Sequence, residues 1–209
     1  MTDQNPSSDP LVSRDLASEA SWYVALVTHA HPHRCYSNAS RALLLLPDLL
    51  CRFVEGWVVV EGARRIVIIE HGWCLKGHQI IDPTWALLPK PGDQPVPVYI
   101  AGVGYTREET QALMGTCLPH VCCCGLYGND GMQHPAYQAA YAAAMQKATL
   151  LAQEAVPPKE VVVTPAEPAS TQKETAMTIT ITVISSSAFW SAFQDRENQH
   201  TGDMGGNDA

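Results

Sequence analysis

Two long apolar runs, joined by a short turn, limit what this chain can fold into more than any other feature. RFVEGWVVVEG (52–62) and RIVIIEHGWCL (65–75) are rich in Val, Ile and Trp, which favour β-strands. Lys76 and Gly77 predict a second tight turn, which leads into a shorter strand within HQIIDPTW (78–85). The three strands together predict an antiparallel meander.

Helical patterns lie on both sides of this meander. Apolar residues recur at helical spacing in four segments, about 10–30, 35–46, 106–114 and 135–155. Asp9 as N-cap and Pro10 at the first position begin the first helix. Pro47 ends the second helix, and Thr106 with Glu109 forms a capping box at the start of the third.

The composition changes along the chain and divides it into four parts. Residues 1–9 are polar and predict disorder, and residues 10–155 predict the folded unit. Residues 156–175 are rich in Pro, Ala and Glu and predict a linker. Residues 176–209 form an extension in which MTITITVISSSAFW predicts an isolated strand before a disordered tail. The fold class is therefore α+β, with helices packed on a small antiparallel sheet and a largely disordered C-terminal extension.

Composition and charge exclude several classes of protein. The net charge of -8, without a cluster of Lys and Arg, argues against a nucleic-acid partner. Residues 1–20 hold no apolar stretch, so no secretory signal is expected, and ALLLLPDLL is interrupted by Pro47 and Asp48, so no membrane association is expected. We expect a cytoplasmic protein whose seven cysteines are free thiols rather than disulfides.

Three residues far apart in the sequence suit nucleophilic chemistry. Cys35 lies at the predicted start of a helix, where the partial positive charge stabilises a thiolate. His71 lies in the second strand and can act as general base and acid. Asp82 ends the third strand and can fix the tautomer of the histidine through its other ring nitrogen. Whether the side chains of His71 and Asp82 face each other depends on the pairing register, which the sequence leaves open.

These motifs, in this order, resemble the transglutaminase-like branch of the papain-like cysteine enzymes. The family pattern is a cysteine opening a helix, a GY/GW strand, a strand bearing HAW and a strand ending in DPT. Over about residues 30–90, this chain has Cys35, Gly56-Trp57, His71-Gly72-Trp73 and Asp82-Pro83-Thr84. Arg34 and Gly72 depart from the family pattern, in which small residues commonly precede the cysteine and Ala follows the histidine.

The resemblance implies a papain-like, transglutaminase-like fold and a catalytic triad of Cys35, His71 and Asp82. It also implies chemistry at an acyl carbon through a thioester: hydrolysis of an amide, deamidation or transfer to an amine. The substrate would be a peptide, a protein or a small amide, and no cofactor is needed. The alternative is a non-enzymatic interaction module on a degenerate scaffold of this type, and the oligomeric state stays open.

Several other residues are candidates to line this site. The backbone N–H of Cys35 would be one oxyanion donor, and the candidates for a second are Tyr23, His29, His31 and His33. Trp73 and Trp85 follow the histidine and the aspartate closely, so one of them would shield the pair from water. The full set of expected substrate-binding or lining residues is His33, Asn38, Glu55, Trp57, Trp73 and Trp85.

Two segments raise the alternative of a metal site, which we do not favour. His29, His31 and His33 alternate and could bind Zn²⁺ or Ni²⁺, but Pro32 interrupts them, and an extended loop lining the cleft fits better. The segment CLPHVCCC (117–124) also combines Cys and His, but adjacent cysteines rarely all reach one ion. We therefore predict no metal.

Overall fold

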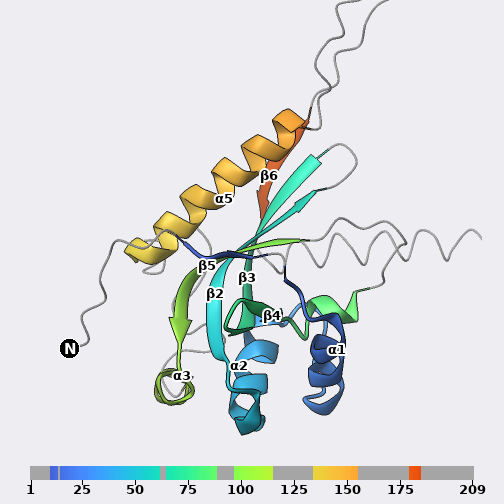
Figure 1. Cartoon of the computed structure of the whole chain (residues 1–209), viewed down its shortest axis with the longest axis vertical. Coiled ribbons are helices and arrows are strands. Elements are labelled where there is room, and N and C mark those ends of the chain that lie inside the picture. Colours follow the sequence, from blue (N-terminus) through green and yellow to red (C-terminus); the bar gives the residue numbers. More distant parts are fainter. Residues whose placement is uncertain are drawn as a thin grey trace, which may run out of the picture.

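A six-stranded mixed sheet with helices against it forms the described part of the chain (Figure 1). The computed structural model describes residues 10–13, 15–61, 65–88, 97–114, 134–154 and 179–184. The strands are β1 (Val12–Ser13), β2 (Arg52–Glu61), β3 (Arg65–Lys76), β4 (Gln79–Ile81), β5 (Val98–Tyr105) and β6 (Thr180–Ile184). Their order is β1-β5-β2-β3-β4, and β6 pairs with β3.

The helices are α1 (Ser18–Val27), α2 (Cys35–Leu45), α3 (Arg107–Met114) and α5 (Pro135–Glu154), with short 3-10 turns η1 (Pro47–Leu49) and η2 (Trp85–Leu87). The predicted second, third and fourth helices are confirmed within two residues at each described end. The capping box is also confirmed, because the Glu109 N–H donates to Thr106 Oγ1 and the Thr106 N–H donates to Glu109 Oε2.

The central meander forms with the predicted strands. Gly56 pairs with His71 in the antiparallel β2–β3 ladder, and Cys74 pairs with Ile81 in the β3–β4 ladder. Gly77 has a positive φ of 62° in the turn between β3 and β4, a conformation that glycine adopts without strain.

Two predictions about the sheet and its ends are wrong. The sheet is not purely antiparallel and the strand in the C-terminal extension is not isolated, because β6 pairs in parallel with residues 65–69 of β3. The first helix begins at Ser18 rather than Pro10, because Val12 and Ser13 pair with β5 instead. In both cases a partner distant in sequence decides the local structure.

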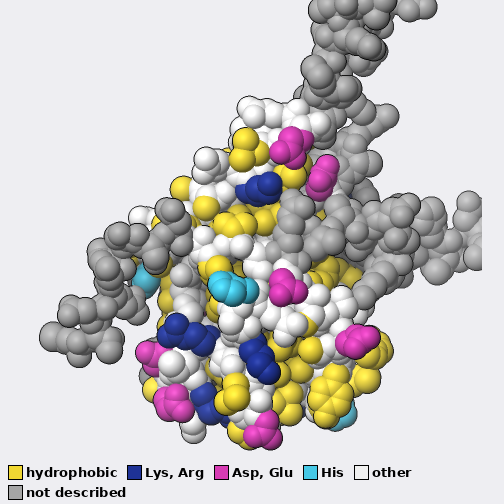
Figure 2. All heavy atoms as spheres, in the orientation of Figure 1, with side chains coloured by type: hydrophobic (Ala, Val, Ile, Leu, Met, Phe, Trp, Pro, Cys, Tyr) yellow, Lys and Arg dark blue, Asp and Glu magenta, His cyan; other side chains and the backbone are white. Residues whose placement is uncertain are grey.

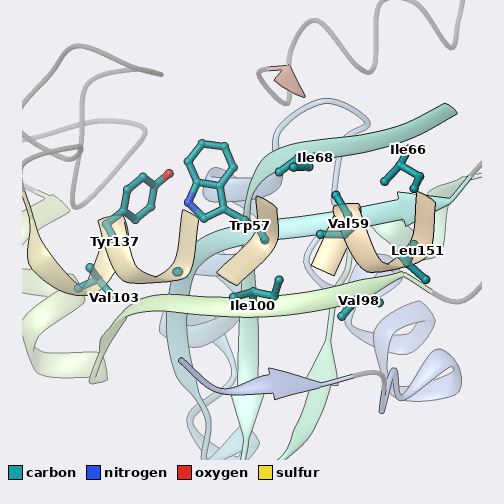
Figure 3. Packing of buried hydrophobic residues seen from close by; sticks show 12 residues of the cluster. Trp57, Val59, Ile66, Ile68, Val98, Ile100, Val103, Tyr137 and Leu151 are labelled. Atoms are coloured by element: carbon teal, nitrogen blue, oxygen red, sulfur yellow. The ribbon is translucent and has the colours of Figure 1, made fainter. Parts of the chain in front are cut away.

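The helices α2 and α5 cover different parts of one face of the sheet. Phe53 and Cys74 of that face pack against α2, and Trp57 packs against Tyr137 of α5 (Figure 3). The opposite face carries a third cluster, which includes Trp73 and the residues Val54, Val58, Ile69, Ile80, Trp85 and Tyr99. His71 alternates with Gly72 along β3 and so projects to this second face.

One helix leaves an apolar surface exposed. Trp22, Tyr23, Leu26 and Val27 of α1 are each about half exposed, and they recur at helical spacing. Figure 2 shows hydrophobic side chains gathered at the lower right, where α1 lies.

Candidate functional site

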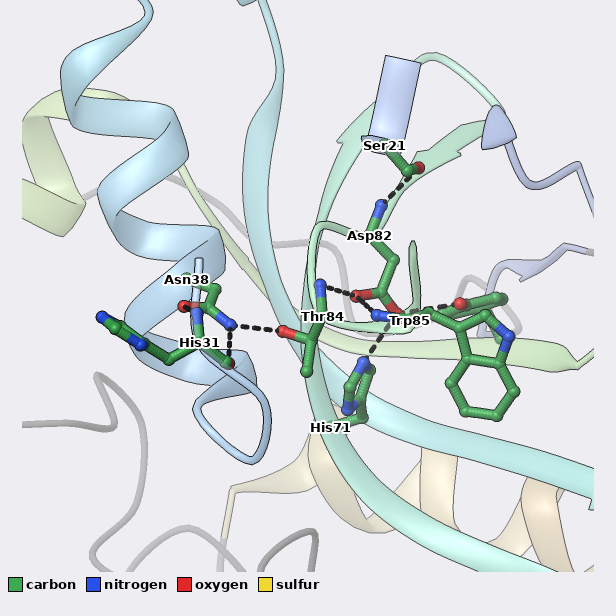
Figure 4. Close-up of polar contacts among 8 residues, drawn as sticks. Ser21, His31, Asn38, His71, Asp82, Thr84 and Trp85 are labelled. Atoms are coloured by element: carbon green, nitrogen blue, oxygen red, sulfur yellow. Dashed lines mark hydrogen bonds and ion pairs between the residues drawn. The ribbon is translucent and has the colours of Figure 1, made fainter. Parts of the chain in front are cut away.

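His71 and Asp82 form a buried pair at an edge of the sheet. Beside β3, β6 pairs as far as Ile69 and β4 pairs from Cys74, so residues 70–73 have no strand partner on that side within the described residues. Asp82 directly follows β4 and enters this gap, where its Oδ2 accepts a hydrogen bond from His71 Nε2 at 2.7 Å (Figure 4). The exposed fractions of the two side chains are 1% and 0%.

The carboxylate of Asp82 is held by further donors. The Tyr99 hydroxyl donates to Oδ2 at 2.9 Å, and the backbone N–H groups of Thr84 and Trp85 donate to Oδ1 at 3.0 and 2.9 Å. Because an ionised carboxylate only accepts, the hydrogen on His71 Nε2 is fixed toward Asp82. The other nitrogen, Nδ1, then remains for a second partner.

The thiol of Cys35, the first residue of α2, also acts on this ring. Burial lowers the pKa of His71, but the charge of Asp82, then that of Cys35, and hydrogen bonds to both raise it to about 10. The helix lies on the other face of the sheet from the ring, so thiol and imidazole meet around the unpaired stretch of β3.

The surroundings of the sulfur are closed and acidic. Cys35 is 0% exposed. Burial, followed by the charges of Tyr137, Glu70, Cys35 and Glu55, holds the pKa of the neighbouring Tyr36 hydroxyl well above its usual value. Two buried carboxylates therefore act on the residue next to Cys35.

The segment before Cys35 is a tight turn rather than the predicted extended loop. His29 and His33 both adopt left-handed backbone conformations, with φ of 49° and 68°. Asn38 fastens this turn: its side chain accepts from the His31 N–H at 3.0 Å and donates to the His31 carbonyl at 2.6 Å and to Thr84 Oγ1 at 2.8 Å. Asn38 thus ties the turn to the DPT segment that carries Asp82 (Figure 4).

The tryptophans predicted to line the site divide into two groups. Trp73 stacks beside His71 at a ring-centroid distance of 6.3 Å, and Trp85 meets the ring edge-on at 6.4 Å. Trp57 instead contacts Tyr137 and Tyr141 of α5, away from the pair.

The other predicted residues also differ in their placement. Glu55 is buried opposite Gly72, next to the pair of Gly56 and His71. His33 is partly exposed, and burial lowers its pKa. Tyr23 and His29 are exposed.

Sequence reasoning missed two residues that hold Asp82. Tyr99 lies in β5, a strand that was not predicted, and Ser21 of α1 accepts a hydrogen bond from the Asp82 N–H at 2.9 Å. The run VYIAGVGY does hold aromatic and β-branched residues, which is the signal that could have found Tyr99.

The described residues contain neither a cluster of metal-ligating side chains nor a membrane-spanning helix. No three of the His, Cys, Asp and Glu side chains there lie close enough to hold a metal ion together. The segment 117–124 lies outside the described residues. None of the described helices is both long and apolar enough to cross a membrane.

No family model, no curated protein and no solved structure matches this chain.

Proposed function

We propose that this protein is a cysteine hydrolase or acyltransferase that acts on amide bonds of a peptide, a protein or a small amide. The observation that carries the proposal is the buried His71–Asp82 pair, on whose imidazole the Cys35 thiol also acts. Together with the order of the motifs in the chain, this supports a transglutaminase-like relative of the papain-like enzymes.

The chemistry follows from the roles of these three groups. The Cys35 thiolate attacks the acyl carbon, and the backbone N–H of Cys35, at the start of α2, donates to the oxyanion. The imidazolium of His71 then protonates the leaving amine, and a thioester remains on the sulfur. Neutral His71 next removes a proton from water or from an amine, which attacks the thioester and regenerates the thiolate. Asp82 keeps the ring oriented throughout.

Burial of the sulfur requires a path for the substrate. Cys35 is fully buried, so part of the surrounding structure must move before an acyl carbon can reach the sulfur, and the turn that precedes α2 is the segment that we propose to move. The hydrogen bonds of Asn38 set the cost of that shift.

The same burial favours a second candidate function, an interaction module that keeps the scaffold without the chemistry. The exposed apolar face of α1, with Trp22 and Leu26, is the kind of surface that such a module uses.

Alkylation of the native protein distinguishes the two functions. After iodoacetamide treatment at neutral pH, trypsin releases Cys35 in CYSNASR (35–41) and Cys74 in IVIIEHGWCLK (66–76), each with one cysteine. Both thiols are fully buried, so Cys74 is a reference that is matched to Cys35 in burial. If the protein is a cysteine hydrolase or acyltransferase, Cys35 should be labelled faster than Cys74.

The role of the imidazole is tested in the same assay. We expect His71→Ala to slow the labelling of Cys35 and the exposed-site control His78→Ala to leave it unchanged. Two outcomes would support the interaction module instead. In the first, Cys35 is labelled no faster than Cys74, and in the second, His71→Ala does not change the rate at which Cys35 is labelled.

A further inference from the structure

A pair of thiols lies at the end of the β2–β3 ladder where β2 begins, three residues along β3 from His71. Cys51 directly precedes Arg52, which pairs with Leu75, so Cys51 and Cys74 are diagonal neighbours on one face of the sheet. Their side chains lie within hydrogen-bonding range of each other, and both pack in the cluster beneath α2. Both are free thiols in the structure.

The two thiols differ in access. Cys51 is partly exposed, whereas Cys74 is fully buried and its Sγ donates to the Ala39 carbonyl of α2 at 3.3 Å. An accessible thiol beside a buried one is the arrangement in which the first attacks an external disulfide and the second resolves the product.

Charge also favours Cys51 as the attacking thiol. A hydrogen bond with Cys74 lowers the pKa of Cys51, and the charges of Arg107 and Lys76 lower it further, against the effect of burial. Arg107 is fixed near this position because its Nη1 donates to the Leu44 carbonyl at 2.8 Å. The hydrogen bond with Cys51, followed by burial, raises the pKa of Cys74.

We propose that Cys51 and Cys74 form a redox-active dithiol that reacts with low-molecular-weight disulfides such as glutathione disulfide. The Cys51 thiolate attacks one sulfur of the external disulfide, which forms a mixed disulfide and releases one thiolate. Cys74 then loses its proton and attacks the Cys51 sulfur, which releases the second thiol. The two protein thiols are oxidised to a disulfide, and the external disulfide is reduced to two thiols.

A disulfide between diagonal neighbours requires the backbone of Cys51 to move toward Cys74. Cys51 lies just outside the β2–β3 ladder, so it can approach Cys74 without breaking the paired residues. Oxidation removes the hydrogen that Cys74 donates to Ala39, and thereby one contact between β3 and the helix that begins at Cys35.

Peptide mapping of the full chain tests this proposal. The native protein is incubated with glutathione disulfide, quenched in acid, blocked with N-ethylmaleimide and digested with trypsin without reductant. Cys51 is released in ALLLLPDLLCR (42–52) and Cys74 in residues 66–76, each as the only cysteine. We expect these peptides to become linked, with the loss of two hydrogens and of both labelled thiols.

Single variants assign the two roles. Cys74→Ser should accumulate glutathione on Cys51, and Cys51→Ser should leave Cys74 reduced. Cys35→Ser should form the same linked peptide as the unsubstituted chain, so the result is independent of the proposed catalytic function. Circular dichroism verifies that each variant is folded, and if Cys74→Ser does not fold, the unsubstituted chain and Cys51→Ser decide.

Three results would overturn the proposal. The first is glutathione on Cys51 of the unsubstituted chain without the linked peptide. The second is no reaction of Cys51 in the native protein. The third is modification of Cys74 in Cys51→Ser at the same rate as Cys51 in the unsubstituted chain.

Discussion

Asp82 is the most constrained side chain of the proposed site, because four donors converge on its two oxygens. Two of these donors, His71 and Tyr99, share Oδ2, and two backbone N–H groups share Oδ1. Because both carboxylate oxygens of Asp82 accept hydrogen bonds, a side chain that carries a donor group cannot replace it without losing some of them. The identity of this residue therefore controls both the ring of His71 and the local backbone.

Replacement of Asp82 by Asn tests this constraint. The amide NH₂ must face a donor in either orientation, and the negative charge that raises the pKa of His71 is lost. We expect alkylation of Cys35 to slow by roughly tenfold or more, and turnover of any amide substrate to fall by about 10⁴-fold. Asp48→Asn, at an exposed position, is the matched control. Unchanged alkylation in Asp82→Asn would show that Asp82 does not act on the thiol through His71.

Tyr99 gives a second prediction at this scale. Tyr99→Phe keeps the ring that packs against Trp73 but removes the hydroxyl that donates to Asp82. A lost hydrogen bond to a buried charge lowers the free energy of unfolding by about 1.5–3 kcal/mol. Urea denaturation measures the change, and Tyr23→Phe on the exposed face of α1 should change it by less than about 0.5 kcal/mol.

Among the elements, α2 and the turn before it are those that we propose to control access to the Cys35 sulfur. The turn contains two left-handed residues, His29 and His33, and its backbone is held at His31 by the side chain of Asn38. The same side chain reaches Thr84, so one residue joins the start of α2 to the segment after β4. Loss of the hydrogen bonds of Asn38 should therefore lower the stability of the fold and also make Cys35 more accessible to alkylating reagents.

A double-mutant cycle on Asn38 and Thr84 measures the energetic coupling between these two side chains. Asn38→Ala removes three hydrogen bonds and should cost about 2–4 kcal/mol of unfolding free energy, and Thr84→Val removes one of them. The coupling between the two changes should be about 0.5–1.5 kcal/mol. Because the turn loosens, Asn38→Ala should also speed alkylation of Cys35. A control cycle that uses Ser37→Ala in place of Asn38→Ala should show no coupling with Thr84→Val. Equal coupling in both cycles would contradict the role given to the hydrogen bond between Asn38 and Thr84.

How well each element could be predicted depends on where its determinants lie. The strands β2 and β3 have long apolar runs, and α3 carries its own cap in Thr106 and Glu109, so local sequence suffices. The glycines of β5 obscure its pattern: at Gly102 a Cβ would lie 2.8 Å from the Glu55 carbonyl, so packing rather than propensity requires glycine there. The residues His71 and Asp82 were found through short motifs, whereas Tyr99 could not be placed without β5.

At the scale of the whole molecule, the protonation of His71 links the site to stability. Its pKa is raised from 6.5 to about 10, so the folded chain holds a proton that the unfolded chain releases between these values. The stabilisation is therefore complete below about pH 6.5 and is lost as the pH rises through 10. Within this window each pH unit should lower the free energy of unfolding by up to about 1.4 kcal/mol.

Urea denaturation between pH 7 and pH 10 checks this dependence. The difference in unfolding free energy between the unsubstituted chain and His71→Asn should shrink as the pH rises. The exposed-site control His78→Asn should show no such trend. A difference that stays constant with pH would mean that His71 takes up no additional proton on folding, either because it is neutral or because its proton comes from the Cys35 thiol.

The sheet is completed by a strand that lies far along the chain from its partner. Residues 180–184 of β6 pair with residues 65–69 of β3, and Ile181 and Val183 pack against the cluster beneath α5. A parallel pairing across so many residues leaves no local signal, which is why the alternation in this segment predicted a strand but not its neighbour.

Two truncations test whether this strand belongs to the folded unit. Deletion of residues 176–209 removes β6, whereas deletion of residues 186–209 keeps it. Because the first deletion exposes the edge of β3 and the apolar cluster, it should lower the melting temperature by roughly 5 °C or more, and the second should leave it unchanged. Hydrogen exchange should also become faster at Ile66 and Ile68 in the first variant alone. Equal melting temperatures for the two truncations would show that the sheet does not depend on β6.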